Sequence, residues 1–219
     1  MRFPTPPRAP ALSIASITMF LAAAIAVHGL RTELDGVQAQ LSAYLVGPFG
    51  WLLQAGYVAL AVGITLLAVD LNRVPPAPHR SAAPLLLFVT GAVALVVTAL
   101  APMRFPDEDL RLVHLVHSTS AQAAFLCTTA AMVLQAWRLR HAPAWQRLAP
   151  TLLAGALACF AGVWVLALVS DLPRGLSQKV LVAGIVVWLT LVVQIALSIQ
   201  ATSAAAYTNS DSELRNHPR

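Results

Sequence analysis

Charge is scarce in this sequence. Asp, Glu, Lys and Arg make up 11% of its 219 residues, and 58% of the residues are hydrophobic. Soluble proteins carry about 25% charged residues. The charges are also absent from the middle of long apolar blocks, which excludes a water-soluble fold for most of the chain. Because these blocks fill most of the sequence, we expect no soluble domain that could house a separate activity.

The apolar residues gather in six blocks: Leu12–Val27, Phe49–Val69, Pro84–Leu100, Leu115–Ala136, Thr151–Val169 and Val180–Ile199. A helix of about 20 apolar residues spans the roughly 30 Å hydrocarbon core of a bilayer. Backbone groups in hydrocarbon need internal partners, which favours helices, and the blocks lack the alternation of barrel strands. The sequence therefore predicts an all-α polytopic membrane protein, a bundle of six transmembrane helices with short loops. We place this domain at residues 12–200, between a cytoplasmic segment 1–11 and a disordered cytoplasmic tail 201–219.

Other absences narrow the function. No block carries an Asp, Glu, Lys or Arg near its centre, and proton pumps and proton-coupled carriers normally need such a group at that depth. A small-molecule transporter is therefore our third hypothesis. The two cysteines, Cys127 and Cys159, lie within blocks and are expected to be small apolar fillers rather than a disulfide or a ligand pair.

The formal net charge of +5 indicates membrane orientation rather than a nucleic-acid partner. With the N-terminus inside, nine cationic residues face the cytoplasm and five face outward. The inner set is Arg2, Arg8, Arg73, Arg80, Arg138, Arg140, Arg147, Arg215 and Arg219; the outer set is Arg31, Arg104, Arg111, Arg174 and Lys179. This excess is typical of cytoplasmic segments, so we predict a membrane protein with both termini in the cytoplasm. The first block also fits a cleavable signal peptide, an alternative that stays open.

The longest outer loop shows helical periodicity. Thr32–Leu45 places Leu34, Val37, Leu41 and Tyr44 on one face. We therefore expect a short amphipathic helix that lies on the outer surface or covers the bundle.

Titratable residues gather at the outer end of the bundle. His114, His117 and Ser118 lie in the first turns of the fourth helix and share one face. Two more groups, His28 and Lys179, are expected at similar depth, and Asp107 is expected just above them. Ionisable groups at membrane level are costly, so their convergence indicates a functional site. We expect an outward-facing polar pocket between the first, fourth and sixth helices.

Three interpretations of this site compete. In the first, these six residues bind a membrane lipid or small hydrophobic ligand, or dock another membrane protein or a second copy; no catalysis and no cofactor are then expected. In the second, His28, His114 and His117 hold a metal or haem in a membrane enzyme or electron carrier. In the third, the histidines only cap the fourth helix and anchor the bundle at the interface.

Four stretches resemble a known family, in order along the chain: LSAYLVGPFGWLLQAGYVALAVG (residues 41–63), FPDE (105–108), VHSTSAQAAF (116–125) and GLSQKVLVAGIVVWL (175–189). Together they are similar to the bacterial six-helix membrane family of domain of unknown function 998 (DUF998), with a weaker likeness to the Frag1/DRAM/Sfk1 group. The resemblance implies six helices and marks Phe105, Pro106, Asp107, His117 and Lys179, but it implies no activity. The family pattern has an acid–arginine pair where this chain has Gln178–Lys179.

Overall fold

The computed structural model describes residues 8–101 and 111–216, and that part of the chain is helical without strands. It contains six α-helices: α1 (Arg8–Leu30), α2 (Gly50–Arg73), α3 (Ala83–Leu100), α4 (Arg111–Leu139), α5 (Ala149–Leu168) and α6 (Arg174–Asn216). Two short 3-10 helices, η1 (Leu41–Leu45) and η2 (Ala77–His79), lie in the loops. The all-α fold predicted from the apolar blocks is confirmed.

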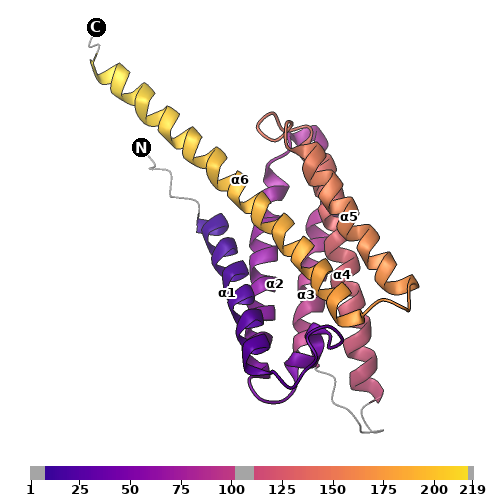
Figure 1. Cartoon of the computed structure of the whole chain (residues 1–219). Helices are drawn as coiled ribbons and strands as arrows, with labels where there is room; N and C mark the ends of the chain where they lie inside the picture. Colours follow the sequence, from indigo (N-terminus) through magenta and orange to yellow (C-terminus); the bar gives the residue numbers. More distant parts are fainter. Residues whose placement is uncertain (1–7, 102–110, 217–219) are drawn as a thin grey trace.

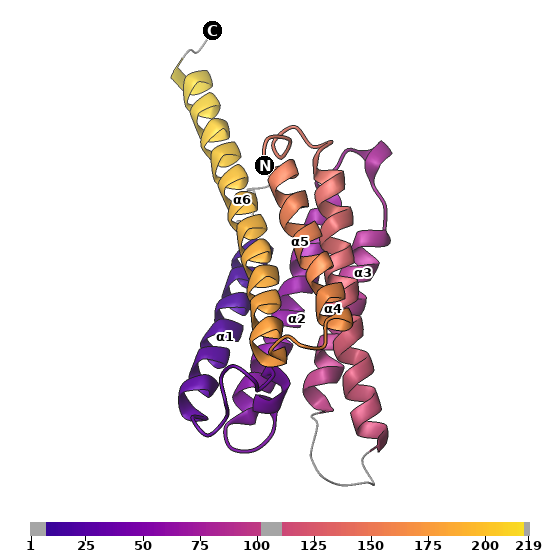
Figure 2. The same ribbon diagram turned by 45° about the vertical axis from the view of Figure 1, so that its right-hand side comes forward.

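The helices form one antiparallel bundle (Figure 1). Each of α1 to α5 packs against the next helix in the chain, and α6 packs against both α5 and α1 (Figure 2). Short connections make successive helices antiparallel neighbours. As a result α1 begins and α6 ends at the same end of the bundle, while loop 1 (residues 31–49) lies at the opposite end with the starts of α4 and α6 (Figure 1).

Five helices in the described ranges are long and apolar enough to cross a membrane: α1, α2, α3, α5 and the part of α6 up to Thr202. Their outer faces carry large apolar side chains such as Ile25, Leu86 and Val187, each more than half exposed. This surface suits a multi-pass membrane protein, in which lipid covers the outside. The sequence predicted six spans, but α4 is not among the helices apolar enough to cross a membrane. Hydroxyl, amide and imidazole side chains between His117 and Gln135 lower its hydropathy.

α6 extends beyond the rest of the bundle (Figure 1). The helix continues to Asn216, whereas the sequence favoured a disordered tail from residue 201. Extending an existing helix avoids the costly nucleation step, and the run of three alanines at 204–206 consists of the best helix former.

Loop 1 does not form the predicted amphipathic helix. Residues 32–39 make turns, in which Asp35 Oδ1 accepts hydrogen bonds from the backbone N–H of Val37 (2.7 Å) and Gln38 (3.3 Å). An aspartate that binds its own following backbone favours a turn over a helix. Only η1 is helical, and its Leu41 and Tyr44 are buried whereas Val37 is exposed. The second half of loop 1 therefore covers the bundle.

Candidate functional site

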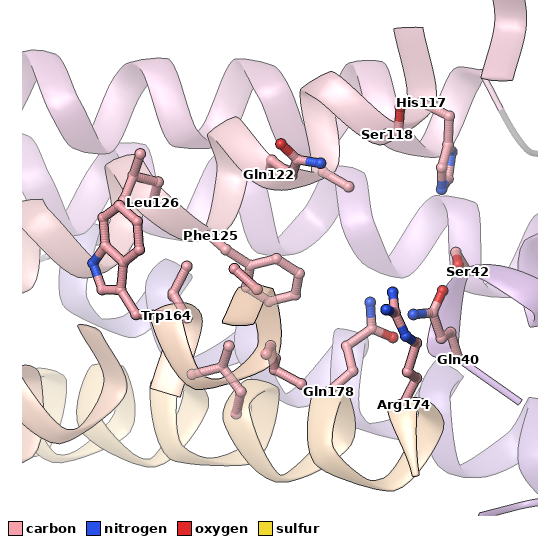
Figure 3. A pocket seen from close by; sticks show the side chains of 15 residues that line it. Gln40, Ser42, His117, Ser118, Gln122, Phe125, Leu126, Trp164, Arg174 and Gln178 are labelled. Carbon is pink, nitrogen blue, oxygen red and sulfur yellow. The ribbon is translucent and has the colours of Figure 1, made fainter. Parts of the chain in front are cut away.

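A cavity of about 530 Å³ lies between α4, α5 and α6 beneath loop 1. Its size falls within the usual range for small-molecule sites, about 300–1,000 Å³. One part of its lining is polar: Gln40, Ser42, His117, Ser118, Arg174 and Gln178. The other part is mainly apolar: Phe125, Leu126, Val163, Trp164, Leu166 and Leu181. Figure 3 shows Gln40, Ser42, His117, Arg174 and Gln178 together at one end, Leu126 with Trp164 at the other, and Gln122 between them. The cavity is therefore mainly polar at one end and mainly apolar at the other.

α4 contributes His117 to the polar end. This imidazole is 2% exposed, and its Nδ1 lies 2.8 Å from the carbonyl oxygen of Ala101, just after α3. A carbonyl oxygen only accepts, so Nδ1 carries the hydrogen and Nε2 of neutral His117 is an acceptor. The side chain points from α4 toward the polar end of the cavity (Figure 3). The bond to Ala101 thus sets both the orientation and the tautomer of His117.

Ser118 also lines the cavity, but its hydroxyl donates to Leu115 of its own helix (3.1 Å). Further along α4, Phe125 marks the change from polar to apolar lining. Phe125 and Gln178 also line a second cavity of about 70 Å³ in the bundle core, which is mostly apolar. Of the polar stripe that the sequence predicts on α4, His117 and Ser118 line the cavity, whereas His114 is exposed outside it.

α6 contributes Arg174 and Gln178, which are four residues apart and share one helix face. Arg174 begins α6, and its guanidinium reaches toward the amides of Gln178 and Gln40 (Figure 3). The side-chain oxygen of Gln178 accepts a hydrogen bond from the backbone N–H of Leu41 (2.8 Å). The amide NH₂ of Gln178 is thereby left to face the cavity.

Loop 1 is fastened to the start of α6. The backbone N–H of Leu176 donates to Val37 O (2.8 Å), and Lys179 Nζ donates to Gly36 O (2.8 Å). A Cβ atom at Gly175 would lie 2.5 Å from Ala39 O, so only glycine permits this approach. These contacts hold loop 1 over the cavity, and Lys179 serves this attachment instead of lining the cavity.

His28 also helps to hold loop 1 in place. Its ring stacks on Tyr44 with centroids 4.2 Å apart, and its Nδ1 bonds to Ala24 O (2.7 Å). The Lys179 ammonium lies 5.1 Å from the centre of the Tyr44 ring. Burial raises the pKa of the Tyr44 phenol. Because Tyr44 occupies the space between His28 and Lys179, the cavity forms beside α5, and not beside α1 as the sequence suggested.

Arg31 braces the far side of loop 1. Its side chain, 10% exposed, donates to the carbonyls of Val46 (2.6 Å) and Pro48 (3.3 Å) and pairs with Glu33. The hydrogen bond from Arg31 holds the pKa of Glu33 below its usual range. These contacts stabilise the turn at Gly47, whose φ is +83°.

The predicted residues therefore separate into groups. His117 and Ser118 line the cavity, His28 and Lys179 support loop 1, His114 is exposed on α4, and Asp107 lies outside the described residues. Residues 8–101 and 111–216 contain no group of three His, Cys, Asp or Glu that could hold a metal ion. In this part of the chain, the three-histidine site of His28, His114 and His117 is therefore not assembled.

Sequence reasoning missed most of the lining, including Gln40, Ser42, Trp164, Arg174 and Gln178. Arg174 was counted only among the outer cations, and Gln178 only as a departure from the family pattern. Their common position near helix ends was the available signal. What brings them together is the docking of loop 1 on α6, which residue spacing does not show.

The family profile of DUF998, described as a protein of unknown function, matches residues 14–194. The chain belongs to this family. The match runs from α1 into α6 and includes every residue named in the cavity lining. No curated protein and no solved structure matches the chain. The cavity of this DUF998 protein must therefore be interpreted from its own geometry.

Proposed function

We propose that this DUF998 protein crosses the membrane six times, with α4 as the sixth span. Several polar side chains of α4 are buried in the bundle: His117, Ser120, Thr128, Thr129 and Gln135 are each at most 9% exposed. Large apolar side chains, Leu112 and Leu115 among them, are exposed on α4. A helix with polar groups inward and apolar groups outward suits lipid surroundings even when its mean hydropathy is low.

The cavity then faces outward from a bacterial inner membrane, and both termini are cytoplasmic. This orientation rests on the cations at the end opposite loop 1: Arg73, Arg80, Arg138, Arg140 and Arg147. Cytoplasmic segments are enriched in Arg and Lys. The end with loop 1 holds Arg31, Arg111, Arg174 and Lys179.

The function we propose is binding of a membrane lipid or similar amphiphile in the cavity. The observation that carries the proposal is the change of lining from polar at the bundle end to apolar toward its middle. Two lining residues at the apolar end are themselves exposed: Leu126 (39%) and Trp164 (48%). The hydrocarbon chain of a lipid could thus enter from the bilayer between α4 and α5 while the lipid headgroup stays at the polar end.

Binding suits these groups better than catalysis. Ser118 donates to its own helix, Gln178 Oε1 accepts from loop 1, and His117 is committed to Ala101 through Nδ1. Nucleophilic catalysis needs a base within hydrogen-bond reach of the nucleophile, and the hydroxyl of Ser118 is directed to the carbonyl of Leu115. Docking of another membrane protein or a second copy stays a prediction.

Mass spectrometry of co-purified lipids tests this function. Ala121 lines the cavity, so Ala121→Trp fills it, whereas Ala154→Trp adds the same side chain to an exposed position of α5. We expect one lipid class to be enriched on the wild type and on Ala154→Trp, and lost from Ala121→Trp. Equal lipid content in all three, with both variants eluting as folded protein, would refute cavity binding.

A further inference from the structure

Charge at the polar end of the cavity specifies the ligand further. We infer that the ligand is an amphiphile with an anionic headgroup, a carboxylate or a phosphate, and one apolar chain inside the cavity; this inference rests on the proposed binding function. In the described part of the chain, Arg174 is the one cavity-lining residue with a full charge, and no acid lines the cavity. Nor does Arg174 form an ion pair with any acid in residues 8–101 or 111–216.

Hydrogen-bonding capacity at this end favours an acceptor-rich headgroup. Arg174 presents a planar fork of N–H donors that matches the oxygens of a carboxylate or phosphate. The NH₂ of Gln178 adds donors because its oxygen already accepts from Leu41 (2.8 Å). Gln40 and Ser42 add an amide and a hydroxyl from loop 1. A headgroup with several negative oxygens can satisfy these donors together, whereas a lone hydroxyl cannot.

His117 extends the match. Its Nδ1 is committed to Ala101 O (2.8 Å), so Nε2 of the neutral ring accepts a hydrogen bond. A singly protonated phosphate supplies that donor and still carries a negative charge. An imidazole that takes up a proton instead donates from Nε2 to the anion. In both protonation states, therefore, the ring is compatible with a titratable oxyacid headgroup.

The length and volume of the cavity favour a ligand with a single hydrocarbon chain. Along α4 the lining runs from His117 to Leu126, nine residues on, which corresponds to roughly 14 Å at 1.5 Å per residue. This is less than half of the roughly 30 Å hydrocarbon core, so the cavity serves one leaflet. A volume of about 530 Å³ is that of a drug-sized site. It suits a compact headgroup with a single chain that ends near Leu126 and Trp164.

A matched pair of probes tests the charge. We would titrate the protein, in nanodiscs of phosphatidylcholine, with 11-bromoundecanoate and 11-bromoundecanol, which share a chain and differ in the headgroup. The bromine quenches nearby tryptophan, and Trp164→Phe identifies the part of the signal that comes from the cavity. In the wild type we expect half-saturation with the carboxylate at a concentration about tenfold or more below that with the alcohol, because charge-assisted bonds are the stronger ones.

Arg174→Gln should raise the half-saturating concentration of the carboxylate about tenfold and leave the alcohol almost unchanged. Arg111→Gln, which removes an exposed cation from the same end of the bundle, is the matched control and should change neither. Equal binding of both probes by the wild type, or no effect of Arg174→Gln, would overturn the anionic headgroup while leaving cavity binding intact.

Two further outcomes separate the remaining explanations. If neither probe quenches Trp164, the proposed binding function fails together with this inference. If inorganic phosphate displaces bromoundecanoate at equal concentration, the site takes free anions, and the assignment of an amphiphile is overturned. We expect phosphate to compete only in large excess, because it has no chain to bury in the apolar end.

Discussion

Gly175 decides how closely loop 1 approaches α6. Its Cα faces the carbonyl of Ala39, and a Cβ there would come within 2.5 Å of the oxygen. Next to it, the N–H of Leu176 bonds to Val37 O (2.8 Å). A larger residue at position 175 would push the loop away and break this bond.

Gly175→Ala should therefore destabilise the protein by about 1–3 kcal/mol, the usual cost of forcing an extra carbon into a packed contact. Gly29→Ala in α1 is the control, because a Cβ at Gly29 meets nothing within 4 Å. Thermal unfolding of both variants measures the difference. A Gly175→Ala protein as stable as the Gly29→Ala protein would show that loop 1 does not depend on this approach.

His141 lies at the other end of the bundle and stacks on His79, with ring centroids 3.9 Å apart and planes 7° from parallel. Arg140 Nε donates to His141 Nε2 (3.1 Å), so Nε2 carries no hydrogen and His141 is neutral here. Arg138 Nε donates to the carbonyl of His79 (3.0 Å) in the same cluster. Desolvation, then the charges of His79 and Arg140, lower the pKa of His141.

This lowered pKa predicts a loss of stability in acid. The folded state resists protonation of His141. The contribution of neutral His141 to the free energy of unfolding is therefore complete above the unfolded-state pKa of about 6.5 and declines as the pH falls below it. His141→Gln removes the titrating group and should reduce the loss of thermal stability between pH 8 and pH 5.5. An equal loss in the variant and the wild type would contradict the neutral, hydrogen-bonded His141.

Among the elements, the helices were predictable and loop 1 was not. Apolar blocks predict helices wherever the backbone must satisfy itself, and polar residues on one face of α4 predict its inward orientation. The periodicity of residues 32–45 also suggested a helix. There, however, Asp35 bonds to Val37 and Gln38, and Gln178 of α6 binds Leu41. The last contact joins residues 137 positions apart, which local periodicity cannot show.

Gln178 provides a test at this scale. Gln178→Glu keeps an acceptor for Leu41 N–H, whereas Gln178→Ala removes it at a cost of about 1 kcal/mol, so amide exchange in residues 36–45 should rise about fivefold in the alanine variant alone. The glutamate also places a negative charge four residues from Arg174, so it should weaken binding of bromoundecanoate. Unchanged exchange in Gln178→Ala, or stronger binding by Gln178→Glu, would count against these roles.

For the whole molecule, the sequence predicted that successive helices alternate in direction but not where the cavity lies. Alternating helices bring His117 and Arg174 to one end of the bundle, as expected from their positions at helix starts. The site lies beside α5 because Tyr44, 1% exposed, fills the space next to α1. The position of the cavity thus depends on how the side chains of loop 1 pack, which cannot be predicted from the number of apolar blocks or from the distribution of charges.

The proposed topology can be tested with single cysteines in a Cys127→Ala, Cys159→Ala background. Gly36→Cys lies in loop 1 and Gln146→Cys lies between α4 and α5, both at exposed positions. With six spans and cytoplasmic termini, a membrane-impermeant maleimide should label position 36 in intact cells and position 146 only after lysis. Labelling of both positions from the same side would exclude α4 as a span.

Photolabelling with a fatty acid that carries a diazirine in its chain tests the central claim most directly. We predict that the labelled peptides contain residues 117–126 of α4 and 163–167 of α5, two of the three helices that line the cavity. Ala121→Trp should abolish this labelling, and Ala154→Trp should not. Labelling that instead follows the lipid-facing surface near Ile25 and Leu86, and persists in Ala121→Trp, would contradict a ligand-binding cavity.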